Sequence, residues 1–364
     1  MKKLAMIGCG GIGQYHLGHF LQFTDIVELA GFCDLIPERA ESFVEKAGSG
    51  KAFTNYIDMY DEIQPDMVFI CIPPYCHGEI EFETIRHGIP FFVEKPLALD
   101  LDLARKIRDA AAEKNLITAS GFQCRYSNLV EPNVKFCQEN EIVFVDASRI
   151  GGMPGVFWWR DKDLSGGQIV EQTIHQFDII RYVFGEPEEV CTYGTRGFLK
   201  GVPDYNTDDL STTIIKFKSG ALATFVSSTN CYPGICTDIQ LYGTNGSGNS
   251  HDSKVIFSSK DKRAELKILG TLKIYGEKPE EPKDDKGGFI VKGDGALSAG
   301  GDCVVYNQDG DAGVLCDRTF IEAVISGDGS KIRSPYADAF KSVSFTMACN
   351  KSMETGLPVK VELE

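Results

Sequence analysis

Two short stretches of the sequence carry side chains that can move a proton or stabilise a developing negative charge. Glu94-Lys95-Pro96 follows an apolar run, and Glu171 and His175 lie four residues apart in a segment of helical periodicity. Pro96 restricts Lys95 to an extended backbone and permits a cis peptide bond, which would aim the ammonium group. A histidine titrates near neutral pH and can accept a hydroxyl proton. These residues predict acid–base chemistry, with a solvated lysine on an ordinary loop as the alternative.

The segment around His175 is predicted to be one helix with its polar side chains on one face. Glu171, Ile174, His175 and Asp178 fall at positions i, i+3, i+4 and i+7 of a helix over residues 168–184. The apolar neighbours predict that this face lies close to buried surface. We expect Glu171 to orient His175, to bind a substrate hydroxyl or to balance the charge of Lys95, with an exposed helical face as the alternative.

Glycines near the N-terminus form a second pattern. Gly8, Gly10 and Gly13, with Gly11 and Ile12 between them, fit GxGxxG between an apolar run and a helical segment. The first glycine permits a tight turn, the second lets the backbone approach a pyrophosphate, and the third allows close packing of helix on strand. The helix N-terminus adds N–H groups and the positive end of its dipole. The pattern predicts dinucleotide binding, and a turn without a ligand is the alternative.

Asp34 extends this prediction to the ribose. It ends the next apolar run, about 20 residues after the glycines, as the dinucleotide fingerprint requires. Its carboxylate can accept hydrogen bonds from both ribose hydroxyls and repels a 2′-phosphate. Leu35 and Ile36 follow it, so no cation is expected nearby to offset the repulsion. NAD is therefore predicted in preference to NADP, and a helix cap ahead of Pro37 is the alternative role for Asp34.

The segment after residues 67–70 belongs to the same predicted cofactor site. In a doubly wound sheet the carboxyl end of each strand faces the cofactor crevice. Ile72, Pro73 and Pro74 are expected to form a wall against the dinucleotide, or else an ordinary loop. His77 follows them and is included in the predicted cofactor site, with capping or packing as its alternative role.

These residues require a scaffold that brings them together. Apolar throughout and separated by amphipathic helical segments, the runs in the first third of the chain predict a parallel sheet covered on both faces. The runs are 4–7, 27–32, 67–70, 90–93 and 116–121, and the helical segments are 12–23, 37–47, 77–87 and 100–114. We therefore predict an N-terminal Rossmann domain, with a doubly wound parallel sheet, over residues 1–121.

The later chain alternates apolar and polar residues with a period of two. The predicted strands are 189–195, 210–218, 221–228 and 237–242, with tight turns at Ser219-Gly220 and Thr244-Asn245-Gly246. They predict a C-terminal α+β domain, residues 122–364, with an open-faced, predominantly antiparallel sheet that serves substrate binding and oligomerisation. Residues 276–302 are expected to form a long surface loop, and residues 314–325 and 338–354 two helices.

The composition excludes several classes of protein. With 364 residues, 43% hydrophobic and 24% charged, the chain can build the cores of two domains. Its net charge of −15 argues against a nucleic acid or an anionic membrane as a partner. The twelve cysteines include no CxxC pair, and neither Cys71/Cys76 nor Cys231/Cys236 has zinc-site spacing. We expect no metal and a cytoplasmic protein with reduced thiols, without a signal peptide or transmembrane segment.

Taken in order, these motifs resemble the Gfo/Idh/MocA oxidoreductase family, which includes glucose-fructose oxidoreductase and inositol dehydrogenases. The resemblance extends from Met1 to about Tyr242 and rests on GxGxxG followed by His16, an acid after the second strand, Pro-Pro-x-x-His, Glu-Lys-Pro and Gly-Gly-x-x-x-Glu-x-x-x-His. It implies a Rossmann domain followed by an open-faced antiparallel sheet that often forms the dimer contact. It also implies reversible hydride transfer between NAD(P) and a carbinol of a sugar or cyclitol.

The resemblance assigns roles to individual residues. It implies that Lys95 contacts the nicotinamide ribose and the reacting oxygen, and that His175 is the acid–base residue. Glu171 departs from the aspartate that many relatives have at this position, and its longer side chain bears on which substrate is bound. The remaining assignments place Gln123, Trp159 and Arg160 with Glu94 at the cofactor, and Arg125 and Tyr126 with Lys95, Glu171 and His175 at the substrate.

Two other functions fit the same sequence. An enzyme can use bound NAD transiently, oxidising and then re-reducing a sugar to hydrolyse or epimerise it. A non-catalytic sensor can use the dinucleotide fold to control a partner protein, although it has no need of Lys95 or His175. The leading prediction is an NAD-dependent dehydrogenase of a sugar, cyclitol or sugar derivative, present as a homodimer or homotetramer.

Overall fold

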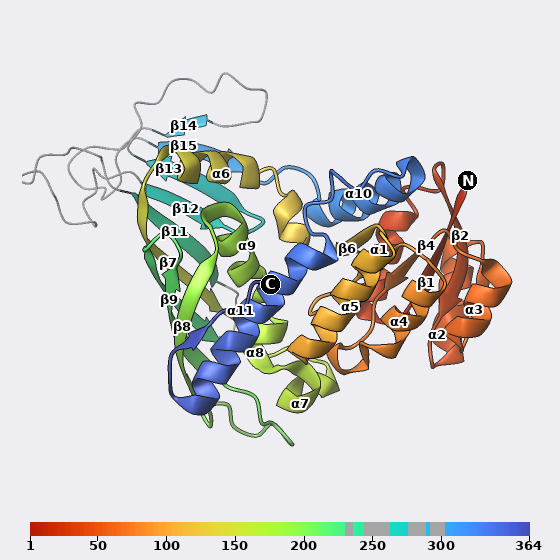
Figure 1. The fold of residues 1–364 in the computed structure, drawn as a ribbon, viewed down its shortest axis with the longest axis horizontal. Helices are drawn as coiled ribbons and strands as arrows, with labels where there is room; N and C mark the ends of the chain where they lie inside the picture. Colours follow the sequence, from red (N-terminus) through yellow and green to blue (C-terminus); the bar gives the residue numbers. More distant parts are fainter. Residues whose placement is uncertain (230–235, 244–262, 276–288, 292–302) are drawn as a thin grey trace, which may run out of the picture.

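A six-stranded parallel sheet forms the first half of the molecule, as predicted (Figure 1). The computed structural model describes residues 1–229, 236–243, 263–275, 289–291 and 303–364. The strand order is β3-β2-β1-β4-β5-β6, that of a doubly wound nucleotide-binding sheet. The strands are β1 (Lys2–Ile7), β2 (Val27–Cys33), β3 (Lys51–Phe53), β4 (Met67–Ile70), β5 (Phe91–Val93) and β6 (Thr118–Ser120).

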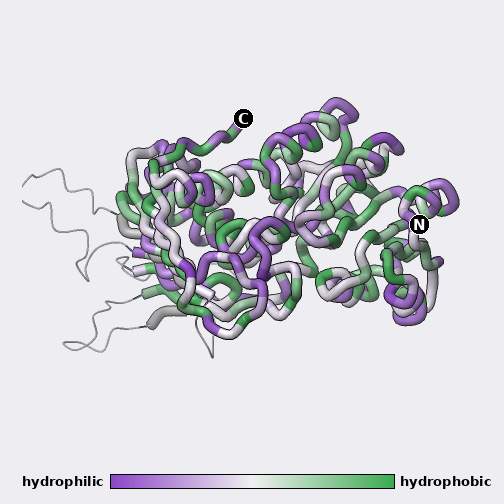
Figure 2. The backbone as a smooth tube through the Cα atoms, turned by 90° about the horizontal axis from the view of Figure 1, so that it is seen from below, coloured by the Kyte–Doolittle hydropathy of each residue, from purple (hydrophilic) through white to green (hydrophobic). Residues whose placement is uncertain are grey.

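Helices cover both faces of this sheet. Alternate residues of β1 point to opposite faces, so Leu4 and Met6 lie in one core while Ala5 and Ile7 lie in the other. The five helices of this half are α1 (Gly11–Phe20), α2 (Pro37–Ala47), α3 (Tyr56–Ile63), α4 (Glu79–Arg86) and α5 (Leu101–Glu113). Hydrophobic segments therefore run through the interior of the half, and hydrophilic ones lie mainly on its outer helices (Figure 2).

The second half is built on a ten-stranded sheet with the order β14-β15-β13-β12-β11-β7-β10-β9-β8-β16. Neighbouring strands are antiparallel except β7 and β10, which run parallel. The strands are β7 (Ile142–Ile150), β8 (Pro187–Thr195), β9 (Leu210–Phe217), β10 (Leu222–Ser228), β11 (Cys236–Gly243), β12 (Arg263–Lys267), β13 (Thr271–Tyr275), β14 (Phe289–Val291), β15 (Cys303–Asn307) and β16 (Val359–Lys360). This confirms the predicted, predominantly antiparallel sheet.

One face of the second sheet is covered by helices and the other is open. Helices α6 (Val130–Glu139), α9 (Ile174–Phe184) and α11 (Tyr336–Thr355) contribute Phe136, Phe177 and Phe345 to the core on the covered face. The predicted turn at Ser219-Gly220 joins β9 to β10 as a hairpin, with Gly220 at a φ of +91°. The turn predicted at 244–246 lies outside the described residues.

Helices α10 (Ala312–Ser326) and α11 bring the end of the chain back to the first half. Cys316 and Phe320 of α10 lie in the core on the α1 side of the first sheet, and Phe340 of α11 lies in the core on its other side. Figure 1 shows α11 running between the two halves. The domain boundary near residue 121 stays a prediction. Helices α10 and α11 lie beyond that boundary in the sequence, yet they pack against the first half.

Several elements differ from the predicted ones. The sequence pattern missed these elements of the described chain: β3, α3, α6, β7, α7 (Lys162–Ser165), β12, β13, β15 and β16. The predicted helix over 168–184 is wrong, because it is two helices, α8 (Gly167–Glu171) and α9. The break follows from Thr173, whose backbone N–H and side-chain hydroxyl both donate to the carbonyl of Gln168, 3.0 and 3.2 Å away. Most of the predicted 276–302 loop lies outside the described residues, but β14 lies within it.

Three short 3-10 turns and one further helix complete the elements near the site. They are η1 (Pro74–Cys76), η2 (Gln123–Tyr126), η3 (Phe157–Arg160) and α7 (Lys162–Ser165), of which η2 follows the last strand of the first sheet. Within the part of the chain that the structure describes, no helix is both long and apolar enough to cross a membrane.

Candidate active site

The glycine loop has the shape that a dinucleotide needs. Gly8 has a φ of +93°, and a Cβ atom there would lie 2.2 Å from the carbonyl oxygen of Cys71. A Cβ atom on Gly13 would lie 2.3 Å from the carbonyl oxygen of Gly8. Around Gly10 and Gly11 nothing lies within 4 Å of the Cβ position, so the loop faces open space at the start of α1. These residues fit the pyrophosphate of NAD, with free N–H groups at the helix N-terminus.

Asp34 is fixed beside this loop. Its carboxylate accepts hydrogen bonds from the backbone N–H groups of Cys9 and Ile36, at 2.8 and 2.9 Å. Both bonds hold the carboxylate at the carboxyl end of β2, where the ribose of a bound dinucleotide lies in this fold. Asp34 therefore lies where its predicted role, hydrogen bonding to the ribose hydroxyls, requires it.

The expectation that no cation lies near Asp34 is wrong. The Arg39 Nη1 atom is 4.0 Å from Asp34 Oδ1, because the first turn of α2 brings the arginine back toward the strand end. A cavity of about 420 Å³ lies next to the carboxylate. Its lining consists of Cys9, Gly10, Gly11, Gln14, Glu38, Arg39, Ser42, Phe43 and Lys46. Two cations thus border the ribose side of the predicted cofactor site.

The Pro73-Pro74 segment follows β4 and lies next to the glycine loop. The Ile72 side chain would be 3.3 Å from a Cβ atom on Gly8. His77 is buried, and its Nδ1 atom lies 2.6 Å from the carboxylate of Glu81 in α4. Its Nε2 atom is covered and has no hydrogen-bond partner among the described residues. The wall against the dinucleotide and the part of His77 in it stay predictions.

Lys95 and Glu171 form an ion pair between the two halves of the molecule. Lys95 lies after β5, followed by a cis peptide bond to Pro96, and its Nζ atom donates to Glu171 Oε1 at 2.8 Å and to the Glu171 carbonyl at 3.0 Å. The other carboxylate oxygen accepts bonds from Trp159 Nε1, at 2.8 Å, and from the Gln172 amide. Burial by itself raises the pKa of Glu171, but Lys95 and these donors lower it below its usual value. Glu171 is therefore an anion that holds Lys95 in place.

His175 lies in the first turn of α9, close to this pair. Its ring is partly exposed and meets the ring of Phe122 edge to face at 6.1 Å. The pKa of His175 is held well below 6.5 by burial and then by the positive charges of Lys95 and Arg149. The imidazole is neutral at physiological pH and is ready to accept a proton. Its Nδ1 atom has no partner among the described residues, so Glu171 does not orient it through a hydrogen bond.

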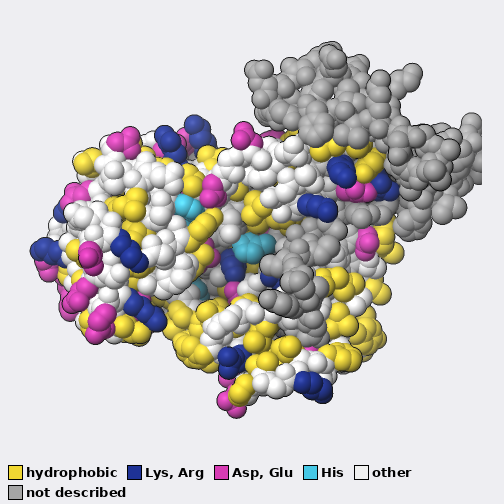
Figure 3. All heavy atoms as spheres, turned by 180° about the vertical axis from the view of Figure 1, so that it is seen from behind, with side chains coloured by type: hydrophobic (Ala, Val, Ile, Leu, Met, Phe, Trp, Pro, Cys, Tyr) yellow, Lys and Arg dark blue, Asp and Glu magenta, His cyan; other side chains and the backbone are white. Residues whose placement is uncertain are grey.

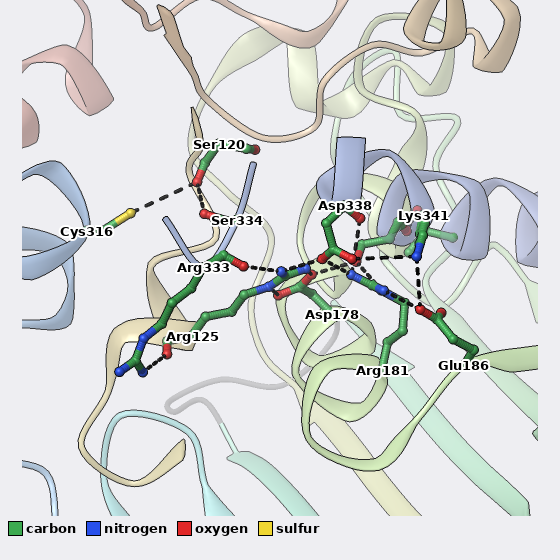
Figure 4. Close-up of polar contacts among 12 residues, drawn as sticks. Ser120, Arg125, Asp178, Arg181, Glu186, Cys316, Arg333, Ser334, Asp338 and Lys341 are labelled. Atoms are coloured by element: carbon green, nitrogen blue, oxygen red, sulfur yellow. Dashed lines mark hydrogen bonds and ion pairs between the residues drawn. The ribbon is translucent and has the colours of Figure 1, made fainter. Parts of the chain in front are cut away.

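The structure does not place Arg125 at the substrate (Figure 4). Its guanidinium is fully buried, donates to Asp178 at 2.8 Å and to the carbonyl of Arg333 at 2.6 Å, and pairs with Asp338. The predicted substrate contact is therefore corrected: these partners occupy Arg125 and tie η2 to α9 and α11. Asp178 likewise faces this network rather than His175.

Tyr126 is also a structural residue. It is buried in the core of the first half, and its hydroxyl accepts a hydrogen bond from the Arg333 backbone N–H at 2.9 Å. No face of the ring is left for a substrate, and the predicted substrate contact is corrected here too.

The three residues assigned to the cofactor by resemblance lie on the segments that enter the second half. Trp159 is fully buried and stacks on Tyr205 with ring centroids 6.4 Å apart. Gln123 and Arg160 are partly exposed, and the Gln123 Oε1 and Arg160 Nε atoms are covered without a partner among the described residues. Trp159 acts on the Lys95–Glu171 pair directly, whereas cofactor contact by the other two stays a prediction.

Glu94 belongs to a buried polar group that the sequence did not reveal, and its contact with the cofactor stays a prediction. Its Oε1 atom lies 3.1 Å from His16 Nε2, and its Oε2 atom accepts the Lys95 backbone N–H at 3.1 Å. On its other side, the His16 ring reaches Asp317 of α10 at 2.8 Å. Burial by itself lowers the pKa of His16, but Asp317 and Glu94 raise it to about 10, so the ring is an imidazolium. Glu94 is thus a positioning residue for Lys95.

His19 joins the same group, because its Nδ1 atom lies 2.6 Å from Asp317. Among the described residues, His16, His19 and Asp317 have the residue types and spacing of a metal-binding group. In this structure each histidine bonds directly to the Asp317 carboxylate. Of the group, only His16 and Glu94 belong to the motifs noted in the sequence; Asp317 lies more than 200 residues away along the chain and carried no signal.

A second set of residues that the sequence did not reveal lies beside Glu171. Arg149 of β7 is buried, and its Nη2 atom donates to Gln172 Oε1 at 2.7 Å. Gln172 in turn donates to Glu171. No motif marks either residue; period-two alternation along 142–150 would have placed Arg149 on the covered face of the sheet. Figure 3 shows histidine and charged side chains in a hollow between the two halves.

Fold and site together define an oxidoreductase that binds a dinucleotide, and the comparison with known families agrees. Residues 2–122 match an oxidoreductase family with an NAD-binding Rossmann fold, and residues 141–248 match the C-terminal domain of the same family. The chain therefore belongs to the Gfo/Idh/MocA oxidoreductase family, as its motifs predicted, and its cofactor is NAD.

Curated relatives and solved structures lie in the same family. A myo-inositol 2-dehydrogenase of Thermotoga maritima is 26% identical over 255 residues, which are 67% of this chain and 73% of the relative. A scyllo-inositol 2-dehydrogenase (NAD(+)) of Bacillus subtilis is 26% identical over 252 residues, 67% of this chain and 72% of the relative. The structure of a levoglucosan dehydrogenase with NADH and L-sorbose superposes with a TM-score of 0.80 at 17% identity, covering 100% of this chain and 99% of that one, which shows the shared fold.

Proposed function

We propose that this enzyme oxidises a secondary alcohol of a sugar, cyclitol or sugar derivative with NAD. The observation that carries the proposal is the Lys95–Glu171 ion pair beside a neutral His175, at the carboxyl edge of the first sheet. Inositol and glucoside dehydrogenases among the relatives support this substrate class. NAD, when bound, supplies the hydride acceptor.

The chain's own residues carry out the rest of the reaction. His175 accepts the hydroxyl proton, because a protonated ketone would be a high-energy product. The Lys95 ammonium stabilises the negative charge that develops on the oxygen. Glu171 and Trp159 hold Lys95 in place, and the imidazolium of His16 fixes Glu94 and with it the backbone of Lys95. In the reverse direction His175 returns the proton to the oxygen.

A substrate screen tests the proposal. Cyclitols, aldoses, sugar acids and sugar phosphates are offered with NAD and with NADP, and nicotinamide absorbance is recorded. Turnover of at least one class with NAD is expected. No response to any class would overturn the dehydrogenase function, and NAD that stays bound while the sugar is hydrolysed or epimerised would indicate the transient use of the cofactor.

We also propose that the enzyme is a homo-oligomer, at least a dimer, joined through the open face of the second sheet. Tyr193, Ile214 and Leu222 are 68%, 52% and 49% exposed on β8, β9 and β10. Ile214 alternates with the buried Ile215, so it points away from the helices. Exposed apolar side chains on three neighbouring strands support cover by a second copy of this chain.

A cytoplasmic location is the last part of this proposal. Cys9, Cys71 and Cys124 are buried free thiols, and burial raises the pKa of each. Protonated, buried thiols are typical of a protein that folds in a reducing compartment. Labelling of the folded and the unfolded protein with a thiol reagent, located by peptide mapping, tests the burial of these three thiols, which are expected to react only after unfolding.

A further inference from the structure

Arg149 lies at the end of β7, on the covered face of the second sheet. Val145 and Ala147 share this face and belong to the core beneath α9. Arg149 continues the row with only 8% of its surface exposed. In the parallel neighbour β10, Ser227 is the partner of Arg149 in register and is buried on the same face. A cation and a hydroxyl thus lie side by side where the sheet reaches the site.

Of the two terminal nitrogens of the Arg149 guanidinium, Nη2 has a hydrogen-bond partner among the described residues and Nη1 has none. Nη2 donates to Gln172 Oε1 at 2.7 Å, and Gln172 donates to the Glu171 carboxylate that holds Lys95. Nη1 is covered and has no partner among the described residues, and the same is true of Ser227 Oγ. A guanidinium has five N–H donors and no acceptor, so a buried, unused donor is costly unless a ligand meets it.

The charge of this group is unbalanced. Lys95 and Arg149 are cations, while Glu171 is the one carboxylate that the described hydrogen bonds join to them. His175 is neutral, and its proton-binding equilibrium responds to both cations. The site therefore has an excess of one positive charge before a substrate enters.

We propose that Arg149, with Ser227, binds an anionic substituent of the substrate, so that the enzyme acts on sugar acids or sugar phosphates in preference to neutral polyols. The inference rests on the proposed function and names the substrate class of that site. An arginine matches the planar oxygens of a carboxylate and the oxygens of a phosphate. The chemistry that both ligands share is an oxyanion, and the substrate pairs below separate them. The oxidation itself is unchanged: one CH–OH becomes C=O, NAD takes the hydride, and His175 takes the proton.

The kinetic test compares substrates that differ in charge alone. kcat/KM is measured with NAD for D-gluconate against D-glucitol and for glucose 6-phosphate against glucose. The anionic member of at least one pair is expected to be better by about 10–100-fold, the usual effect of a charge-assisted hydrogen bond. Arg149→Gln should remove most of that advantage: kcat/KM should fall further for the anionic member of the pair than for the neutral member, which loses only what the contact of Arg149 with Gln172 contributes. Arg149→Lys, which keeps the charge, should recover part of it.

A matched control and a binding measurement complete the test. Lys216→Gln removes one positive charge from the outer face of the same sheet, beside Glu188, and should leave both ratios unchanged. Calorimetric titration of the NADH-bound enzyme with D-gluconate, D-glucitol and glucose 6-phosphate should show tighter binding of an anion, weakened by Arg149→Gln. Thermal unfolding and NAD affinity verify that each variant is folded. If Arg149→Gln does not fold, the comparison of charged and neutral substrates is made with Arg149→Lys.

The results distinguish this inference from the proposed function. Equal activity and equal binding for charged and neutral members would overturn the role of Arg149, as would a loss of the same size for both, which would mean that Arg149 only positions Gln172 and Glu171. No turnover of any substrate would overturn the dehydrogenase function, and in that case the titrations alone decide the anion site.

Discussion

At the residue scale, the pKa of His175 makes a direct prediction about pH. Because the pKa lies well below 6.5, kcat/KM for alcohol oxidation should stay level on its acid side through pH 6.5 and fall only below it. Lys95→Met removes a positive charge near the ring, so the acid limb of its residual activity should move up toward 6.5. Steady-state profiles of both enzymes test this. If the activity of the wild type fell with a pKa at or above 6.5, the pKa of His175 would not be lowered by its surroundings.

The role of His175 as the base predicts a large and specific loss of rate. His175→Ala should lower kcat by about 10²–10⁴-fold, the usual contribution of positioned acid–base catalysis, while NAD affinity stays near that of the wild type. His87→Ala, which removes an exposed histidine at the end of α4, is the matched control and should be fully active. Near-full turnover of His175→Ala, under conditions where chemistry limits the rate, would mean that another group or water is the base.

Cofactor preference depends on Asp34 and on the cations beside it. Asp34→Ser removes the carboxylate that repels a 2′-phosphate and leaves Arg39, Ser42 and Lys46 lining the cavity. NADP affinity should rise and NAD affinity should fall, each by about tenfold, the effect expected of one hydrogen bond to a charged group. Adding Arg39→Gln should remove the gain in NADP affinity. Titration of protein fluorescence measures both constants, and an unchanged NADP affinity in Asp34→Ser would count against the arrangement.

At the element scale, the imidazolium of His16 joins α1, α10 and the loop that carries Lys95. The folded-state pKa of about 10 exceeds the unfolded value of 6.5. The imidazolium therefore stabilises the fold fully below pH 6.5, and the stabilisation is lost as pH rises toward 10. His16→Gln should cost about 3–5 kcal/mol near pH 6, because it removes the buried cation between Glu94 and Asp317 and leaves His19 as the remaining histidine partner of Asp317.

The measurement is the difference in unfolding free energy between the wild type and His16→Gln, taken at pH 6 and at pH 9.5. The difference should narrow at the higher pH, whereas other titrating groups contribute equally to both proteins and cancel. Reduced turnover in His16→Gln, with unchanged NAD affinity, would accompany displacement of the Lys95 backbone. A difference that stays constant with pH would mean that the buried ring is not charged.

The sequence predicted those elements whose pattern is set by burial alone. The strands β1, β2, β4, β5 and β6 are short apolar runs that cannot face water, and the glycine loop follows from backbone geometry that only glycine allows. β3 is a three-residue strand at the edge of the sheet, too short for a pattern. The break between α8 and α9 depends on side-chain hydrogen bonds of Thr173, which propensity does not reveal.

Part of the candidate site could also be predicted from the sequence. Lys95, Glu171 and His175 carry chemistry on their own and were found by type and spacing. Arg125 fitted an expected substrate role, but its partners Asp178 and Asp338 come from distant parts of the chain, and only the fold shows that they occupy it. Asp317 and Arg149 act through contacts with residues that are remote in sequence, so no local pattern marks them.

At the scale of the whole molecule, the chain crosses between its halves more than once. After the second sheet is built, α10 and α11 return to the two faces of the first sheet, and α11 continues into the core of the second half. Lys95 from the first half and Glu171 from the second meet across this junction. Shared helices therefore fix the relative position of the two halves, and with it the distance on which the ion pair depends.

The remaining surface to account for is the open face of the second sheet. The wild type should be at least a dimer at micromolar concentration, with a mass of at least twice the 40.0 kDa of the chain. Ile214→Lys places a charge in the middle of the apolar group on β8, β9 and β10, so the dimer should dissociate at about tenfold higher concentration or more, because burial of an unpaired charge is costly. Leu35→Lys replaces a side chain that is 89% exposed on the first half and serves as the control.

Light scattering across a dilution series gives the masses of the wild type and of both variants. A wild-type mass of 40.0 kDa throughout would show that the face is solvated, and an equal effect of Leu35→Lys would show that the contact does not use this sheet.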